Sequence, residues 1–111
     1  EPKRFYAYIM RLRDGRFMGE VNVRKSDTAP WHEMGIVLEA EFRGQGYAVE
    51  ALNLLLKYAF VNLNAGAVHN RFEMNRTAAV RTHLAAGFKE YNKENGNIEL
   101  LITREQYFRD K

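Results

Sequence analysis

Two glycines stand where a predicted strand gives way to a predicted helix, in the segment Arg43-Gly44-Gln45-Gly46-Tyr47-Ala48. The first backbone N–H groups of a helix lack partners within the helix, and the helix dipole makes that end electropositive. Glycines let the backbone adopt left-handed angles and let a ligand approach it closely. The segment is therefore a candidate phosphate site, although a structural turn explains the same residues. It is neither a Walker A loop nor the dinucleotide fingerprint, because Gly-Lys-Ser/Thr and a third glycine are both absent.

His83 is the second candidate for chemistry, because it shares a helical face with Ala79, Val80 and Gly87. That spacing places an ionisable ring on the side that should face the core. Histidine titrates near neutral pH and suits acid–base work, but a core histidine bonded to a carbonyl is the alternative. His32 and His69 show no partner spacing, so we expect no metal site.

The composition is that of one globular domain over residues 1–111, with 46% hydrophobic residues, no Cys and a net charge of +3. The absence of Cys excludes a thiolate nucleophile and a cysteine zinc site. The longest apolar stretch, residues 51–63, is interrupted by polar side chains, so we expect no membrane span and a cytoplasmic location. The positive charge would favour anionic ligands.

The elements that must position these residues are predicted from periodicity. Strands are expected over residues 5–12, 17–24 and 32–39, with an Asp-Gly hairpin between the first two and a period of two that puts Phe17, Gly19, Val21 and Val23 on the core face. An amphipathic helix is expected over 47–62, a short strand over 68–74, and a second helix over 77–86, with Asn75 as its N-cap and Gly87 after it. Strands over 88–93 and 98–103 would close a hairpin at Asn95-Gly96-Asn97. The fold class is therefore α/β (α+β), with a mixed, largely antiparallel sheet flanked by helices.

The pattern R-x-x-G-x-A at residues 43–48 resembles the acyl-CoA-binding motif of the GNAT N-acetyltransferases. The preceding string 33–38 and the segment 79–88, which ends in Gly-Phe, resemble the same family. The segments 58–60 and 102–107 are similar to its RimJ/RimL-like subgroup. The resemblance implies an acyl-CoA N-acyltransferase-like fold and transfer of acetyl from acetyl-CoA to a primary amine, on a protein N-terminus or a small molecule.

The resemblance also implies a set of cofactor-binding residues. Backbone amides of the glycine turn would cradle the pyrophosphate, the strand backbone would pair with the pantetheine arm, and Arg43 would contact a phosphate or be a solvated surface residue. These residues are Ile36, Val37, Leu38, Arg43, Gly44, Gln45, Gly46, Tyr47 and Ala48. The family's helix-start Asn falls on Arg76, with Asn75 one place earlier, so one of the two takes that contact or Asn75 only caps the helix.

For catalysis the resemblance implies a general base and a general acid. An amine acceptor must lose a proton before it attacks the thioester. Glu33, at the start of the strand before the glycine turn, is the first candidate for the base, and Glu73 is the second. His83 would protonate the departing thiolate.

Whole domains of this family begin with a further strand and two helices, so the resemblance implies an N-terminally truncated, partial domain. The sheet edge left exposed would favour a homodimer. A catalytically inactive acyl-CoA-binding fragment is the second hypothesis. A basic nucleic-acid-binding hairpin is the third, although no RNP, KH or helix-turn-helix signature accompanies it.

Overall fold

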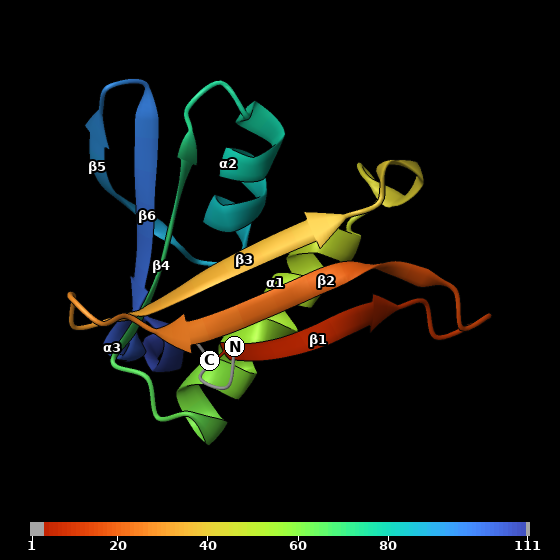
Figure 1. The fold of residues 1–111 in the computed structure, drawn as a ribbon, viewed down its shortest axis with the longest axis horizontal. Coiled ribbons are helices and arrows are strands. Elements are labelled where there is room, and N and C mark those ends of the chain that lie inside the picture. The colour runs from red at the N-terminus through yellow and green to blue at the C-terminus, as the bar shows by residue number, and fades with distance from the viewer. Residues whose placement is uncertain (1–3, 111) are drawn as a thin grey trace.

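A six-stranded mixed sheet organises the fold in the computed structural model, which describes residues 4–110 (Figure 1). The strand order is β1-β2-β3-β4-β6-β5. The strands are β1 (Arg4–Met10), β2 (Phe17–Lys25), β3 (His32–Leu38), β4 (Ala67–Glu73), β5 (Lys89–Glu94) and β6 (Asn97–Thr103). All pairs of neighbouring strands are antiparallel except β3 and β4, so the predicted mixed, largely antiparallel sheet is confirmed.

The first three strands form the expected antiparallel meander. Gly15 turns the first hairpin with a φ of 70°. The register of β1 and β2 shifts between Ile9 and Met10, and this bulge changes which side chains face the core. Phe17 is 46% exposed and Met18 is 3% exposed, so the prediction that Phe17 faces the core is wrong. The predicted core face of Gly19, Val21 and Val23 is confirmed.

The parallel pair β3 and β4 separates almost as soon as it forms. Within residues 4–110 the two strands pair only at His32 with Val68 and at Glu33 with His69. Beyond Glu33 they diverge, and in Figure 1 the gap between them opens toward α2. The later part of β3 therefore keeps β2 as its partner on one edge and leaves its other edge free of strand pairing.

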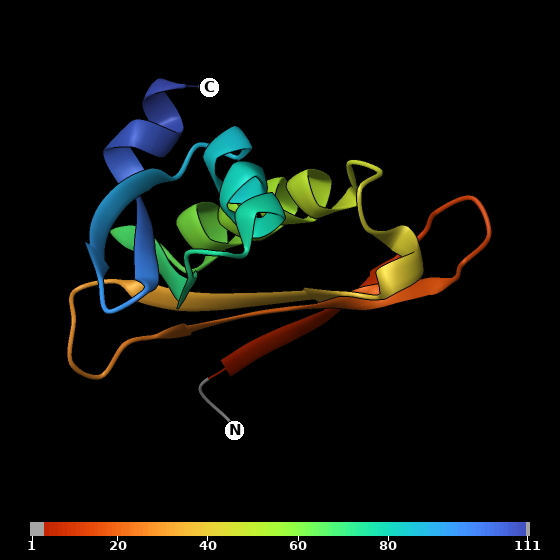
Figure 2. The same cartoon turned by 90° about the horizontal axis from the view of Figure 1, so that it is seen from above.

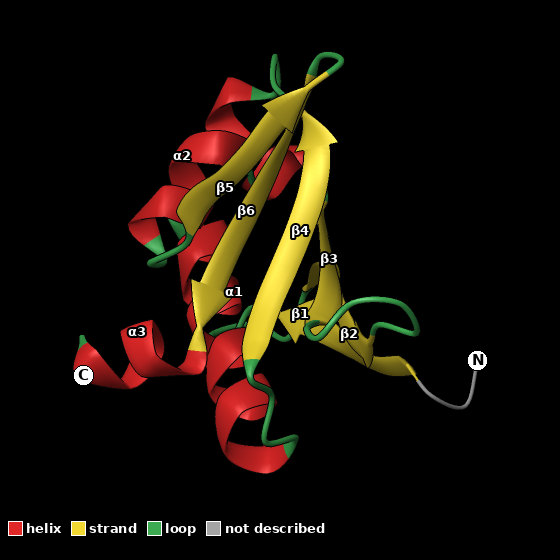
Figure 3. Ribbon diagram, turned by 90° about the vertical axis from the view of Figure 1, so that its left-hand side faces the viewer, coloured by secondary structure: helices red, strands yellow, loops and turns green. Residues whose placement is uncertain are grey.

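The helices α1 (Tyr47–Lys57) and α2 (Thr77–Ala85) lie together on one side of the sheet (Figures 2 and 3). Their apolar side chains and the inward-facing strand residues form the main core, which includes Val23, Leu52, Leu56, Phe60, Val68, Phe88, Leu100 and Ile102. The sequence predicts one helix over residues 47–62, and the chain is helical there. However, its last five residues, Tyr58–Asn62, form a wider π turn.

The short helix α3 (Arg104–Arg109) follows β6 and was not predicted. Thr103 and Gln106 form a reciprocal capping box at its start, a signal that is present in the sequence. Arg104 then donates from Nη1 to the Phe60 carbonyl at 2.6 Å, at the π turn of the first helix. This bond ties the C-terminal segment to the end of α1.

Two further expectations concern the ends of elements. The hairpin at Asn95-Gly96 is confirmed, since both residues have positive φ, as a tight two-residue turn requires. The N-cap of α2 is Arg76 and not Asn75, and no side chain caps that helix. Asn75 lies one residue too early, in the turn that follows β4, so its predicted role as N-cap is wrong.

No helix within residues 4–110 is long and apolar enough to cross a membrane.

Gly19 gives a test of the packing between β2 and β3. A Cβ atom at Gly19 would lie 2.0 Å from the Val37 carbonyl oxygen, a backbone atom that cannot move without breaking the strand pair. We expect Gly19→Ala to lower the free energy of unfolding by about 2 kcal/mol or more, measured by chemical denaturation. The matched control is Gly66→Ala, where a Cβ meets nothing within 4 Å and which should change stability by less than about 0.5 kcal/mol. Equal effects at the two sites would contradict this account.

Candidate functional site

A cavity of about 480 Å³ lies between α2 and the end of β3, where β3 no longer pairs with β4. Its walls come from the end of β3, the glycine turn, the first turn of α1, and α2. The lining residues are Ile36, Val37, Leu38, Arg43, Gly44, Ala48, Arg76, Thr77, Ala78, Ala79, Thr82 and His83. An elongated ligand can therefore lie along the free edge of β3, opposite α2.

The glycine turn forms one end of this cavity. Gly44 and Gly46 have φ values of 73° and 87°, and Gly46 is the N-cap of α1. A Cβ at either glycine would meet nothing within 4 Å, so the backbone there borders open space. The N–H groups that begin α1 have no partners inside the helix and give this end a positive potential. The geometry suits a phosphate group close to the main chain.

The start of α2 borders the same cavity, so two helix N-termini face it. Arg76, Thr77 and Ala78 line the wall there, and the Arg76 guanidinium also lies 5.3 Å from the centre of the Phe72 ring. Arg43 lines the cavity from the other side and donates from Nε to the Leu38 carbonyl at 2.9 Å. The cavity thus combines two helix dipoles and two guanidinium groups, a setting that favours an anionic ligand.

The structure brings together seven of the predicted cofactor-binding residues at this cavity: Ile36, Val37, Leu38, Arg43, Gly44, Ala48 and Arg76. Four others are not among its lining residues. Gln45 bonds the Glu41 carbonyl, Gly46 caps α1, Tyr47 lines a different groove, and Asn75 lies in the turn before α2. The sequence analysis did not predict Thr77, Ala78, Ala79 and Thr82, because near α2 it placed cofactor contacts only at the two residues that precede the helix.

His83 is buried behind this cavity with both ring nitrogens in hydrogen bonds. Nδ1 donates to the Ala79 carbonyl at 2.8 Å, and since a carbonyl can only accept, that nitrogen carries the proton. Nε2 then accepts from the Asn70 side-chain amide at 3.0 Å. Burial lowers the pKa of His83, with Arg76 lowering it further, while the bond to Ala79 raises it. The ring is therefore neutral near pH 7, and its Nε2 has no proton to give.

Glu33 lies on the opposite face of the sheet, in what we call the carboxylate–histidine cluster of Glu33, His69 and Glu99. His69 is 4% exposed and lies between the two carboxylates, with Nδ1 2.7 Å from Oε1 of Glu33 and Nε2 2.7 Å from Oε1 of Glu99. Trp31 donates from Nε1 to the other oxygen of Glu33 at 2.7 Å. The pKa of Glu99 lies below its usual value, chiefly because Asn92 donates to it and also because of His69.

No local spacing in the sequence links His69 or Glu99 to a partner. The three members of the cluster come from β3, β4 and β6, and only the strand order places them side by side. Glu73, the second candidate base, lies exposed at the end of β4. Within residues 4–110 no group of three or more His, Cys, Asp or Glu side chains is arranged to hold a metal ion.

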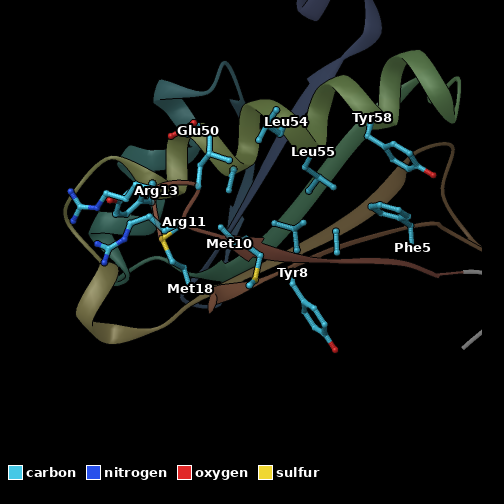
Figure 4. A pocket seen from close by; sticks show the side chains of 16 residues that line it. Phe5, Tyr8, Met10, Arg11, Arg13, Met18, Glu50, Leu54, Leu55 and Tyr58 are labelled. Atoms are coloured by element: carbon cyan, nitrogen blue, oxygen red, sulfur yellow. The ribbon is translucent and has the colours of Figure 1, made fainter. Parts of the chain in front are cut away.

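A second hollow, of about 600 Å³, lies between β1 and α1 and is mostly apolar. Figure 4 shows Arg11 and Arg13 at one end of this groove and Phe5 and Tyr58 at the other. The rings of Phe5 and Tyr58 stack with centroids 4.1 Å apart. The charged side chains that line this groove are Arg11, Arg13 and Glu50.

The buried neutral ring of His83 predicts a pH dependence of stability. Because its folded-state pKa lies below 6.5, the unfolded chain binds a proton more readily, and the free energy of unfolding falls as the pH drops below about 6.5. We expect His83→Gln to flatten this fall between about pH 7.5 and about pH 5.5, measured by denaturant unfolding. The control is His32→Gln. Because His32 is only partly buried, its substitution should flatten the pH dependence of the free energy of unfolding less. An unchanged slope in His83→Gln would contradict the assignment.

Comparison with known proteins now identifies the fold. The family model described as an acetyltransferase (GNAT) domain matches residues 1–89. No match was found among the curated proteins. Among solved structures, a variant of the spermidine N-acetyltransferase from Vibrio cholerae superposes with a TM-score of 0.86 at 20% identity, covering 100% of this chain and 71% of that one.

Two further structures agree. The Vibrio cholerae enzyme in complex with CoA and spermine gives a TM-score of 0.83 at 20% identity, with 96% of this chain and 69% of that chain covered. A GNAT-family acetyltransferase from Bacillus anthracis gives 0.81 at 18% identity, with coverages of 93% and 67%. At these identities the superpositions establish the fold, and the match to the family model establishes membership. The chain belongs to the GNAT acetyltransferase family.

Proposed function

We propose that this chain binds acetyl-CoA in the cavity between the end of β3 and α2 and transfers the acetyl group to a primary amine. The observation that carries the proposal is the unpaired edge at the end of β3, which borders a cavity that two helix N-termini face. An acyl-CoA ligand has a phosphate-rich end and a long thin arm, and the cavity offers a matching electropositive end and a free strand edge. Membership of the GNAT family supports the same ligand.

In this proposal the phosphates lie at the glycine turn and the pantetheine arm lies along β3. The open space beside Gly44 and Gly46 leaves room for a phosphate at the backbone N–H groups. The unpaired edge of residues 36–38 would hydrogen-bond the arm as a further strand would. Arg43 and Arg76 line the cavity and would add charge-assisted contacts to phosphate.

Glu33 is the proposed general base. Its side chain is 31% exposed, so an acceptor amine can reach it, and it lies near the closed end of the gap where β3 and β4 still pair. The proton would move from the ammonium nitrogen to a carboxylate oxygen, which frees the nitrogen lone pair to attack the thioester carbonyl. His83, beside the cavity, is the candidate for the general acid, a role that requires Nε2 to gain a proton before it protonates the departing thiolate.

The acceptor class we propose to test first is the polyamines. The support is that structural neighbours are named as spermidine N-acetyltransferases and that one holds CoA and spermine. Protein N-termini are the second class, because of the resemblance to the RimJ/RimL-like subgroup. A non-catalytic acyl-CoA-binding protein is the alternative function, and the hydrogen bonds that occupy both nitrogens of His83 favour it.

Acetyl-CoA binding is tested by Ala48→Asp, measured by titration calorimetry. Ala48 lines the cavity in the first turn of α1, where a carboxylate stabilises the helix but repels phosphate. We expect the Kd for acetyl-CoA to rise about tenfold or more. Ala48 is preferred to Gly46, because the φ of 87° at Gly46 would strain any other residue.

The matched control is Asn53→Asp, which adds the same charge on the exposed side of the same helix and should leave the Kd unchanged. Absence of acetyl-CoA binding by the wild-type chain would overturn the proposed function.

The role of Glu33 is tested by Glu33→Gln, with acetyl transfer to spermidine followed by release of CoA. We expect kcat to fall about 10²-fold or more, while the Kd for acetyl-CoA stays the same, because Glu33 does not line the cavity. Glu73→Gln, which changes the second candidate on an exposed site, should retain activity. If Glu73→Gln lost activity and Glu33→Gln kept it, the two assignments would be reversed.

A further inference from the structure

We propose that His69 is a positioning residue for the acetyl-transfer reaction, because it holds the Glu33 carboxylate in one orientation. The inference rests on the proposed role of Glu33 as the base. Its observation is the carboxylate–histidine cluster, in which a nearly fully buried imidazole bridges two carboxylates through bonds of 2.7 Å.

The direction of the hydrogen bonds at His69 follows from counting donors and acceptors. Glu99 is ionised near pH 7, because hydrogen bonds from Asn92 and His69 lower its pKa. An ionised carboxylate can only accept, so Nε2 of His69 donates to Glu99. An ionised Glu33 likewise only accepts, so Nδ1 donates to it, and this bond fixes the position of its Oε1.

The orientation of Glu33 is set by two donors. His69 holds Oε1 from β4, and Trp31 holds Oε2 through its indole N–H at 2.7 Å. The indole of Trp31 also stacks on the imidazole, with centroids 4.3 Å apart and planes 16° apart. Each carboxylate oxygen has two lone pairs, so both oxygens keep one that can accept a proton from an amine.

Glu99 holds the far end of the imidazole. It lies on β6, beside β4, and its second oxygen accepts from Asn92 of β5 at 3.0 Å. The titratable and charged groups around His69 are therefore Glu33 from β3, Glu99 from β6, Tyr91 from β5, whose ring meets His69 edge-on at 6.4 Å, and Arg71 on its own strand. The two carboxylates are the groups in direct hydrogen-bond contact.

The test compares His69→Phe with His69→Asn in the acetyl-transfer assay. Phe keeps a ring for Trp31 to stack on but donates no hydrogen bond, whereas the Asn amide can replace Nδ1 as a neutral donor. We expect His69→Phe to lower kcat near neutral pH about tenfold, because Glu33 loses the donor that orients its Oε1. His69→Asn should recover most of the rate, and the Kd for acetyl-CoA should be unchanged in both.

A wild-type kcat in His69→Phe would overturn the proposal. Glu99→Gln provides a second route if His69→Phe does not fold, because it removes the far carboxylate and leaves His69 in place. We expect Glu99→Gln to lower kcat by a smaller factor, and an unchanged kcat would again overturn the proposal. His32→Phe, on the neighbouring strand and outside the cluster, is the control and should keep the wild-type kcat.

The NMR signals of the His69 ring separate this inference from the proposed function. We expect Glu33→Gln and Glu99→Gln each to shift the imidazole resonances of His69, because each replaces a direct hydrogen-bond partner of the ring. A wild-type chain that transfers no acetyl group overturns the proposed function. His69 resonances that neither substitution shifts overturn the cluster itself.

Discussion

The separation of two parallel strands inside a continuous sheet is the constraint on which the rest of the structure depends. Strands that diverge leave backbone N–H and C=O groups without ladder partners, and buried groups of this kind must find others. The Leu38 carbonyl accepts from Arg43, and the Arg71 N–H donates to the Asn70 side chain. The gap is thus a stable feature of the sheet, and the cavity that α2 covers is a consequence of it.

The strand β4 is held in place by a histidine on each face of the sheet. On the helix side, His83 of α2 bonds Asn70, and on the other side His69 itself joins β4 to β3 and β6. The first contact fixes the distance between β4 and the helix that walls the cavity. The second holds β4 against β3 at the point where the strands begin to diverge. The two histidines therefore stabilise the same strand through different partners, because one ring bonds a carbonyl and an amide while the other bonds two carboxylates.

Local sequence patterns were sufficient for most elements of the fold. Asp14-Gly15 and Asn95-Gly96 predicted two hairpins, the alternation after Phe17 predicted β2, and the spacing of Ala51, Leu52 and Leu55 predicted α1. The bulge that exposes Phe17 has no local signal, since it depends on the pairing of β1 with β2. The same holds for the carboxylate–histidine cluster, whose members lie 36 and 30 residues apart in the chain. The glycine turn could be predicted because its positive φ angles require glycines, and both glycines lie in one short segment. The α2 wall of the cavity depends instead on how that helix packs.

Trp31 gives the carboxylate–histidine cluster an optical signal of its own. It is the single tryptophan of the chain, and its indole both bonds Glu33 and stacks on His69. Indole emission responds to the charges and rings that surround it. The intrinsic fluorescence excited in the tryptophan band therefore arises entirely at the end of the gap where β3 meets β4. Changes at that point of the sheet can be followed in the unlabelled protein without interference from any other indole.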